Sequence, residues 1–247
     1  MRDELARSYE FMARGDMSGT RVVELPFGRA VYTDELPRRL DGNYLWVDRA
    51  AEPEELVAEA ARLERRLIFV PDPELGDALA PWFEQQSWRI DRHVVMAQLR
   101  EPEREADLSL VNEVSEPDLR EARKRVLANE PWATPQVLEQ IFAAKALIGD
   151  RVRTRFFAVE LAGEVVSYSD LYLDDGDAQV EDVGTVPEHR NEGHATAVVL
   201  AAVAEARQAG AEFVFLVADA NDWPKALYGR LGFDVVGHYT KFFAPPK

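Results

Sequence analysis

The chain has 247 residues, of which 47% are hydrophobic and 30% are charged, and its formal net charge is −16. This composition is typical of a globular protein, while the acidic charge argues against binding to nucleic acid or to an anionic membrane, because both need a basic face. Since the sequence contains no cysteine, disulfides, a catalytic thiol and cysteine-rich zinc sites are excluded.

Neither a secretory signal nor a membrane span is expected. The first seven residues are mostly charged and lack the apolar core of a signal peptide. The longest apolar run, 195–204, covers half of the ~20 residues that cross a bilayer. We therefore expect a cytoplasmic protein without a membrane partner. The four histidines, at positions 93, 189, 194 and 238, show no metal-ligand spacing, so no metal is expected.

The first hundred residues contain a weaker copy of a pattern found near the C-terminus. Val57-Ala-Glu-Ala60 matches Val203-Ala-Glu-Ala206 at an offset of 146, and at the same offset Ile68-Phe-Val70 aligns with Val214-Phe-Leu216. A helix–strand–helix–strand unit is therefore predicted to occur twice. The segment 43–48, which precedes the first copy, contains no glycine, so this copy is predicted to lack a phosphate-binding turn.

Residues 100–107 are the predicted linker, because all of them are charged apart from one proline and one alanine. They separate a domain at 1–100 from a domain at 107–247. In the second domain, hydrophobic periodicity and turn residues predict both helices and strands. The expected strands are 108–114, 155–161, 164–173, 179–186, 212–218 and a final segment ending near 243, and the expected helices are 117–129, 135–148, 195–210 and 221–231.

The segment 181–195 is predicted to be a strand, a tight turn and the beginning of a helix. The amides of residues 190–195 lie where a new helix leaves its N–H groups without partners, at the positive end of the helix dipole. Gly193 lets a diphosphate approach the backbone because it has no Cβ, and Arg190 adds a charge-assisted hydrogen bond. The turn therefore suits a phosphate, although it matches neither G-x-G-x-x-G nor G-x-x-x-x-G-K-[ST].

Two motifs of the second half resemble the GNAT acyltransferase superfamily, over about 140 residues. The first, Arg190-x-x-Gly193-x-Ala195, resembles the [QR]-x-x-G-x-[GA] loop that binds acyl-CoA in that family. The second, Asn221-Asp-Trp-Pro-Lys-Ala-Leu-Tyr228-Gly-Arg-Leu-Gly-Phe233, looks like the family's N-x-x-A-x-x-L-Y-x-x-x-G-F helix. About thirty residues and one strand separate the two motifs, so together they are a specific signal.

The resemblance implies an α/β fold with a mixed, largely antiparallel twisted sheet flanked by helices, preceded by a smaller, degenerate GNAT-like α/β unit. It implies an N-acyltransferase that uses acetyl-CoA or another short acyl-CoA and acts on an amine of a small molecule or a protein. The strand end at 183–186 would pair with the pantetheine arm. The expected cofactor-binding residues are Val183, Gly184, Thr185, Val186, Arg190, Asn191, Glu192, Gly193, His194, Ala195 and Asn221.

Three residues are the candidates for catalysis. By the resemblance, Tyr228 is the general acid that protonates the departing CoA thiolate, as a phenol with a pKa near ~10 can do. The general base stays open. Many family members carry a glutamate at the position of Gln179, so Glu181, two residues along on the same face of the strand, is one candidate. Asp182 is the other, if the strand is bulged at Gly184.

The acceptor pocket is expected to be built from the two helices at 117–148 and the strand at 164–173, with the first half of the chain as an optional contributor. Aromatic candidates for its lining, each of which also fits a core position, are Trp132, Tyr168, Tyr172 and Trp223. Two other functions remain: a catalytically inactive acyl-CoA sensor, motivated by Gln179, and a nucleotide-binding Rossmann unit in which Asp219 holds a ribose. A single glycine in the turn disfavours the second. The oligomeric state is not determined, and a homodimer is one option.

Overall fold

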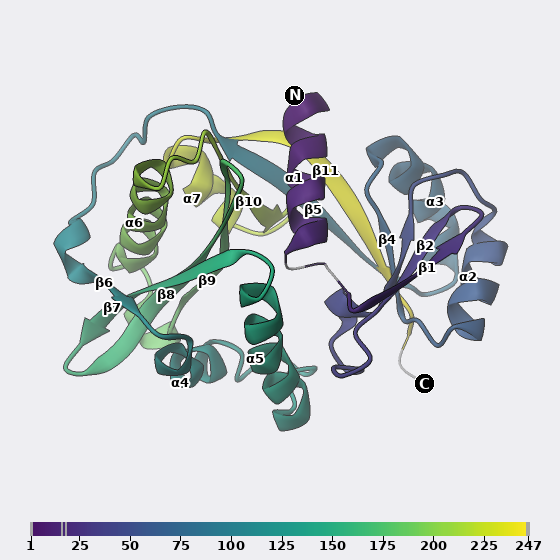
Figure 1. Ribbon diagram of the computed structural model, residues 1–247, viewed down its shortest axis with the longest axis horizontal. Helices are drawn as coiled ribbons and strands as arrows, with labels where there is room; N and C mark the ends of the chain where they lie inside the picture. Colours follow the sequence, from purple (N-terminus) through teal and green to yellow (C-terminus); the bar gives the residue numbers. More distant parts are fainter. Residues whose placement is uncertain (1, 16, 18, 246–247) are drawn as a thin grey trace. The chain divides into compact units, whose positions relative to one another are not determined.

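The chain folds into two compact units, which Figure 1 shows in a computed structural model. The structure describes residues 2–15, 17 and 19–245. The first unit is made of the residues up to Val95, of 217–222 and of the residues from Val235 onward. The second unit is made of residues 96–216 and 223–234. Strands β5 (Arg89–Gln98) and β11 (Phe233–Phe243) therefore contribute residues to both units, and the linear division at 100–107 stays a prediction.

The first unit is a sheet with the strand order β1-β2-β3-β4-β11-β5. The pairs β1–β2, β2–β3 and β4–β11 are antiparallel, whereas β3 and β4 are parallel and are joined through helix α2. Its remaining strands and its helices are β1 (Arg21–Leu25), β2 (Gly28–Tyr32), β3 (Tyr44–Val47), β4 (Leu67–Val70), α1 (Arg2–Arg14), α2 (Pro53–Arg62) and α3 (Pro73–Gln85).

Both faces of β3 and β4 are covered, which is why their sequences, Tyr44-Leu-Trp-Val47 and Leu67-Ile-Phe-Val70, are apolar at every position. On one face they pack against α2 and α3, where Phe83 is fully buried. On the other face the ring of Tyr9, from α1, meets the ring of Phe69 edge-on at 6.4 Å. A continuous apolar run of four residues thus marks a central strand here.

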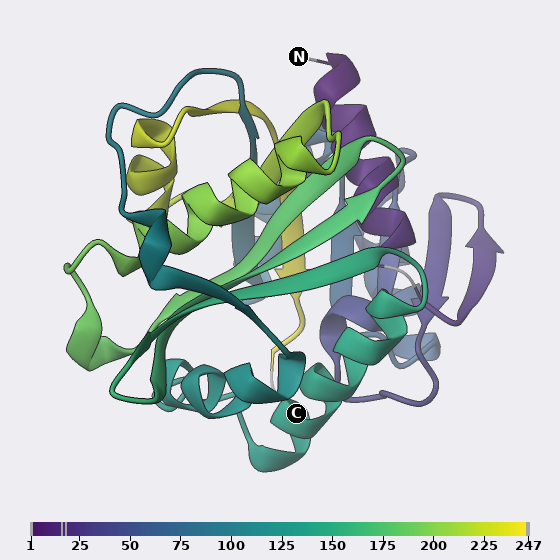
Figure 2. The same ribbon diagram turned by 60° about the vertical axis from the view of Figure 1, so that its left-hand side comes forward.

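The second unit has the strand order β5-β10-β9-β8-β7-β6. The ladders β6–β7, β7–β8 and β8–β9 are antiparallel, whereas β9 and β10 are parallel and are bridged by α6. In Figure 2, α6 lies on one face of β7–β9, and α4 and α5 lie on the other. The bounds are β6 (Val111–Val114), β7 (Arg153–Leu161), β8 (Glu164–Asp174), β9 (Asp177–Thr185), β10 (Phe213–Asp219), α4 (Glu116–Val126), α5 (Pro135–Gly149), α6 (His194–Gln208) and α7 (Pro224–Arg230). The predicted mixed, largely antiparallel α/β fold is confirmed.

Local sequence signals explain most of these boundaries. The carboxylate of Asp118 accepts a hydrogen bond of 2.9 Å from the amide of Ser115 and so closes a capping box at the start of α4. The β7–β8 hairpin turns at Ala162 and Gly163, both with positive φ, as a two-residue turn requires. The strand expected at 108–114 begins only at Val111, because 108–110 form a 3₁₀ turn.

The helix–strand–helix–strand pattern recurs in the structure at the offset of 146. Shifted by this offset, α2 falls on the last ten residues of α6, and β4 falls on the first four residues of β10. In the same way α3 falls over α7, and β5 falls over β11 within two residues. Both copies also contain a parallel strand pair joined through a helix, β3–β4 and β9–β10. The two halves of the chain therefore share one supersecondary pattern.

The first unit holds a partly buried cluster of polar side chains. The Nζ of Lys241 lies 2.6 Å from Oδ1 of Asp41, and the ring of His93 stacks on Tyr239 at 5.1 Å. Burial lowers the pKa of His93 to about 4, and the positive charge of Lys241 adds to this effect. His93 is therefore neutral in the folded protein at neutral pH.

Acidification is predicted to destabilise the protein through His93. The unfolded chain protonates this imidazole near its ordinary pKa of ~6.5, and the folded chain only near about 4. Between these values the unfolded state binds more protons, so the free energy of unfolding falls as the pH falls. Between pH 7 and pH 5, the free energy of unfolding measured with urea should fall by about 2 kcal/mol more in the wild type than in His93→Gln.

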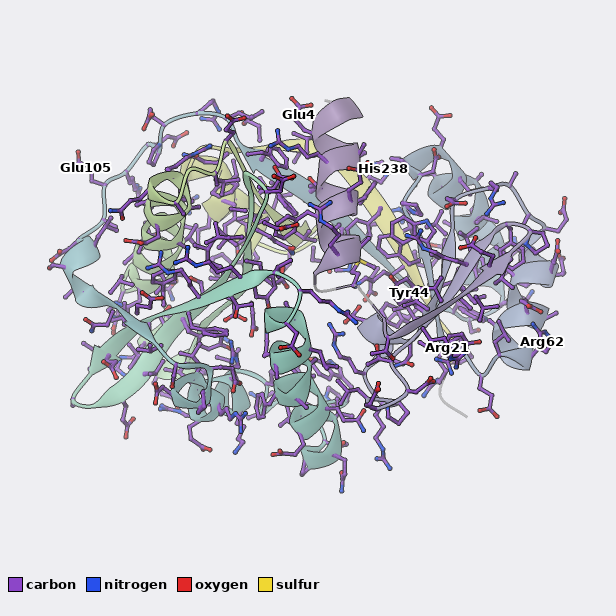
Figure 3. All side chains as sticks on the ribbon, viewed as in Figure 1. Glu4, Arg21, Tyr44, Arg62, Glu105 and His238 are labelled. Atoms are coloured by element: carbon purple, nitrogen blue, oxygen red, sulfur yellow. The ribbon has the colours of Figure 1, made fainter. Side chains whose placement is uncertain are left out.

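His238, which Figure 3 labels on β11, provides the control for this measurement. His238→Gln should keep the pH dependence of the wild type, because the effect comes from the burial of His93 and not from the loss of a histidine. Equal pH dependence in the wild type and in His93→Gln would contradict the burial argument.

Candidate functional site

The loop between β9 and α6 leaves the beginning of α6 uncapped. After β9 the chain makes a 3₁₀ turn at Pro187–His189 and then enters the left-handed region twice, at Asn191 (φ +66°) and Gly193 (φ +87°). The first helical bond within the turn runs from the amide of Ala197 to the carbonyl of Gly193, at 3.1 Å. The amides of residues 194–196 therefore have no helical acceptor, and no side chain of the described residues caps this end.

Gly193 keeps the space before these amides open. Its φ of +87° favours glycine, and a Cβ built on it would meet no atom within 4 Å. Gly184 differs, since a Cβ there would lie 2.3 Å from the ring of Tyr168, which fills the space above it. Packing inside the sheet therefore requires the glycine at 184. The glycine at 193, by contrast, leaves an accessible surface.

The last residues of β9 are partly engaged by the neighbouring strand β8. The amide of Val186 donates to the carbonyl of Val166 at 2.9 Å, so it has no free hydrogen for a ligand. The hydroxyl of Thr185 lies 2.9 Å from that of Ser167. Arg190 is exposed, and its Nε donates to the carbonyl of Thr185 at 3.2 Å, which anchors the guanidinium beside the loop.

A β-bulge interrupts β9 at Asp182. Glu181 pairs with Asp170 and Gly184 pairs with Tyr168, so Asp182 and Val183 together face the single residue between them on β8. Asp182 has a φ of +51°, which an aspartate tolerates better than most residues. The strict alternation of side chains expected along this strand is therefore wrong beyond Glu181.

Asp182 is held by a buried network of charges. Its Oδ2 accepts hydrogen bonds from Nε of Arg123 at 2.8 Å and lies 3.2 Å from Nζ of Lys145. The same two cations contact Asp170, at 2.5 Å from Arg123 and 2.7 Å from Lys145. Arg123 also reaches Glu116 at 3.2 Å. Asp170 is fully buried, and Arg123 is the largest fully buried side chain among the described residues.

These charges keep Asp182 ionised. Burial alone raises the pKa of Asp182, but the charges of Lys145 and Arg123 outweigh it, and the pKa lies below its ordinary value. The pKa of Lys145 lies well above its ordinary value, because Asp170 and Asp182 overcome the opposing effect of burial. Since a carboxylate with a lowered pKa accepts protons poorly, Asp182 suits a fixed negative charge better than a general base.

Glu181, the other candidate base, is positioned by Gln179. The Nε2 of Gln179 donates to Oε2 of Glu181 at 2.7 Å. Gln179 itself is 1% exposed, and its Oε1 finds no hydrogen-bond partner among the described residues. Gln179, which stands where many family members carry a glutamate, therefore orients Glu181, the carboxylate proposed to take over that role.

Tyr228 is a buried residue of α7, with its ring 6.3 Å from that of Phe233. The helix predicted at 221–231 begins later than expected, at Pro224, and Trp223 rather than Asn221 occupies its cap position. Asn221 instead lies in the turn after β10, where its amide donates to Oδ1 of Asp219 at 2.7 Å, and it belongs to the first unit. Of the aromatic candidates for the acceptor pocket, Tyr168 and Tyr172 are core residues, whereas Trp132 and Trp223 are exposed.

The spacing of the histidines predicts no metal site, yet the structure brings two of them to one carboxylate. Oε2 of Glu192 lies 3.4 Å from Nδ1 of His189 and 3.1 Å from Nε2 of His194. The three ligand atoms all lie within 4.8 Å of one another. The hydrogen bonds from both imidazoles lower the pKa of Glu192. A search for clusters of histidines alone misses this group, because its third member is a glutamate.

Residues 117–233 match the model of the family described as Acetyltransferase (GNAT) family. This range includes the bulge of β9, the uncapped start of α6 and Tyr228. No curated protein matches the sequence.

Several solved structures resemble the whole chain. A functionally unknown conserved protein from Staphylococcus epidermidis has a TM-score of 0.67 at 12% identity, with 92% of this chain and 94% of that chain covered. A GCN5-related N-acetyltransferase from Kribbella flavida has a TM-score of 0.66 at 18% identity, with 98% and 96% covered. A tandem GNAT protein from the clavulanic acid biosynthesis pathway has a TM-score of 0.57 at 14% identity, with 100% and 96% covered. At such identities the likeness shows the fold alone.

Removing one cation from the charge network is predicted to lower the free energy of unfolding. Lys145→Met leaves the two buried carboxylates with one cation fewer, and urea unfolding should show a loss of about 3 kcal/mol in the free energy of unfolding. The double variant Lys145→Met with Asp170→Asn removes one charge of each sign and should recover part of that loss.

Lys124 supplies a matched control for this experiment, since it forms an ion pair with Glu121 at 2.8 Å on the surface. Lys124→Met should change the free energy of unfolding by less than about 0.5 kcal/mol. If Lys145→Met proves as mild as Lys124→Met, the network does not hold Asp182 as described.

Proposed function

We propose that residues 117–233, which match the GNAT acetyltransferase family model, transfer an acetyl group from acetyl-CoA, or from another short acyl-CoA, to an amine. The observation that carries this proposal is the uncapped beginning of α6 behind an open left-handed glycine at 193. Amides without acceptors at the positive end of a helix bind diphosphate. The exposed guanidinium of Arg190, anchored beside the same loop, adds a positive charge.

The coenzyme would lie along the end of β9 and the following loop. Residues 183–185 are proposed to face the pantetheine arm, and the amides of 191–195 the diphosphate. Because the amide of Val186 already bonds to Val166, its contribution is limited to shape. Asn221 stays a proposed contact. Its turn belongs to the first compact unit.

The residues divide the proton transfers of the reaction between them. The amine nitrogen forms a bond to the thioester carbonyl carbon, the carbon–sulfur bond breaks, and the thiolate takes a proton from the hydroxyl of Tyr228. The nitrogen then gives up its second proton as the amide forms, and this proton restores the hydroxyl of Tyr228. Glu181, oriented by Gln179, accepts the proton that the ammonium form of the acceptor must lose. Asp182 stays anionic between its two cations and attracts the positively charged acceptor.

The first half of the chain is proposed to be a degenerate GNAT-like copy, with the domain ranges 1–100 and 107–247. Its parallel strands β3 and β4 and helix α2 repeat the arrangement around α6. Only residues 48–52 connect β3 to α2, and they contain neither a glycine nor a residue with positive φ. The first copy therefore has no counterpart of the loop at 186–193, and we assign the coenzyme to the second copy alone.

The proposed acceptor is an amine of a small molecule or a protein. Within the described residues, no helix has the length and apolar character needed to span a membrane. The net charge of −16 suits a cationic amine better than a polyanion such as nucleic acid. A cytoplasmic location and a homodimer remain expectations from the sequence.

A second candidate function is an acyl-CoA sensor without turnover, and Gln179 is the observation that favours it. In that case acetyl-CoA binds to the same loop, but no amine accelerates the release of CoA. Following free thiol over a panel of polyamines, aminoglycosides and lysine peptides separates the two functions. Release above the rate without amine supports the transferase, and its absence across the panel supports the sensor.

The proposed diphosphate site predicts that a negative charge at 193 weakens coenzyme binding. Gly193→Asp places a carboxylate in the open space before the uncapped amides, where it repels the diphosphate. By isothermal titration calorimetry, we expect acetyl-CoA affinity to fall more than about tenfold, or about 1.4 kcal/mol.

Gly163 offers a matched control, because it also has a positive φ (+84°) and open space above it, but lies in the β7–β8 hairpin. Gly163→Asp adds the same charge and the same backbone strain and should leave acetyl-CoA affinity unchanged. If Gly193→Asp and Gly163→Asp bind acetyl-CoA with equal affinity, the loop before α6 does not bind the diphosphate.

The role of Tyr228 predicts a separation of turnover from binding. Tyr228→Phe keeps the ring that packs against Phe233 but removes the acidic hydroxyl. With any amine that turns over, kcat should fall about 10²- to 10⁴-fold, while acetyl-CoA affinity stays within about twofold. Full turnover in Tyr228→Phe would exclude this tyrosine from the proton transfer.

A further inference from the structure

His189, Glu192 and His194 offer three ligand atoms at one point of the loop before α6. One carboxylate oxygen, Oε2 of Glu192, contacts a ring nitrogen of each histidine, at 3.4 Å and 3.1 Å. All three atoms lie within 4.8 Å of one another. Neither the proposed acetyl transfer nor the diphosphate contact uses this arrangement, because both depend on main-chain amides, Tyr228 and the carboxylates of β9.

Two of the three separations between the ligand atoms match those of a tetrahedral ion. Zinc binds imidazole nitrogen and carboxylate oxygen at about 2.0–2.2 Å, so two ligand atoms of a tetrahedral site lie about 3.3 Å apart. The separations of Oε2 of Glu192 from the two ring nitrogens, 3.4 Å and 3.1 Å, are close to that edge length, and the two ring nitrogens lie within 4.8 Å of each other. Two histidines and one glutamate are a known zinc ligand set that leaves a fourth position open. Harder ions such as Mg²⁺ prefer six oxygen ligands, which this cluster lacks.

The backbone prearranges the three side chains. His189 ends the 3₁₀ turn, and its amide bonds to the carbonyl of Val186 at 3.0 Å. His194 is the first residue of α6 and is 9% exposed, so its ring is fixed by the helix. The left-handed residues Asn191 and Gly193 lie on either side of Glu192 and turn the chain where its side chain meets both rings. Binding an ion therefore needs a movement of the two imidazoles toward each other, from within 4.8 Å to about 3.3 Å, while Glu192 keeps its place between them.

We propose that His189, Glu192 and His194 form a binding site for a divalent transition-metal ion of the zinc class. The two imidazoles and the carboxylate supply three ligands, and water or a ligand anion supplies the fourth. The alternative is that Glu192 only accepts hydrogen bonds from the two histidines. The two readings differ in what Glu192→Gln does, because an amide oxygen keeps the hydrogen bonds but is a much weaker ligand for zinc.

The test uses full-length protein without a histidine tag, freed of metal by a chelator and without coenzyme. Isothermal titration calorimetry should show one Zn²⁺ per chain, and Co²⁺ should develop the intense visible absorption of a tetrahedral site. Glu192→Gln and His189→Gln should each weaken Zn²⁺ binding by more than about tenfold, because even outer-shell changes reach that size. Mg²⁺ should give no signal.

His238→Gln serves as the control, since His238 faces Asp77 at 3.6 Å and lies in the first unit. It should bind Zn²⁺ as the wild type does. Thermal denaturation without metal confirms that each variant is folded, and added Zn²⁺ should raise the Tm of the wild type and of His238→Gln but not of Glu192→Gln.

Zn²⁺ binding that is absent in the wild type, or unchanged in Glu192→Gln, would overturn the proposal. Because these measurements contain no coenzyme and no acceptor, such a failure leaves the proposed acetyl transfer untouched.

Discussion

The structure depends on a helix that begins without a cap. α6 is fixed in position because nine of its residues are buried, including Val198, Val199 and Ala202, and it bridges the parallel strands β9 and β10. A helix held in this way aims its first amides at one place, and the left-handed conformation of Gly193 keeps that place open. Unpaired main-chain donors are costly unless water or a ligand satisfies them. We therefore propose the uncapped end as a binding surface built from backbone, which would tolerate variation in the side chains around it.

The buried charges hold the bulged backbone of β9 in place. The bulge places Asp182 in a left-handed conformation, and two cations from α4 and α5 hold its carboxylate there. Buried ion pairs rarely add net stability compared with apolar residues of the same size. Their contribution here is to fix one backbone path next to the proposed acyl site and to keep Asp182 charged. Gly184, which must remain small beneath the ring of Tyr168, ties the same stretch of β9 to β8.

Much of this arrangement could be predicted from the sequence, because it rests on local patterns. Apolar periodicity and turn residues place the helices and strands within a few residues, and the loop with Gly193 is visible as a motif. The charge network could not be predicted, because Arg123, Lys145 and Asp170 are far apart in the sequence and each alone looks like a surface residue. The predicted start of the last helix at residue 221 was wrong, because the residues before Pro224 form a turn of their own. The assignment of β11 to both units also depends on strand pairing across 170 residues, which no local pattern encodes.

A structure of the protein with CoA bound tests the account most directly. It should show the diphosphate oxygens within about 3.2 Å of main-chain amides between residues 191 and 196, with Gly193 in its present left-handed conformation. CoA bound with its diphosphate away from this loop, and with these amides covered by side chains, would contradict the central claim.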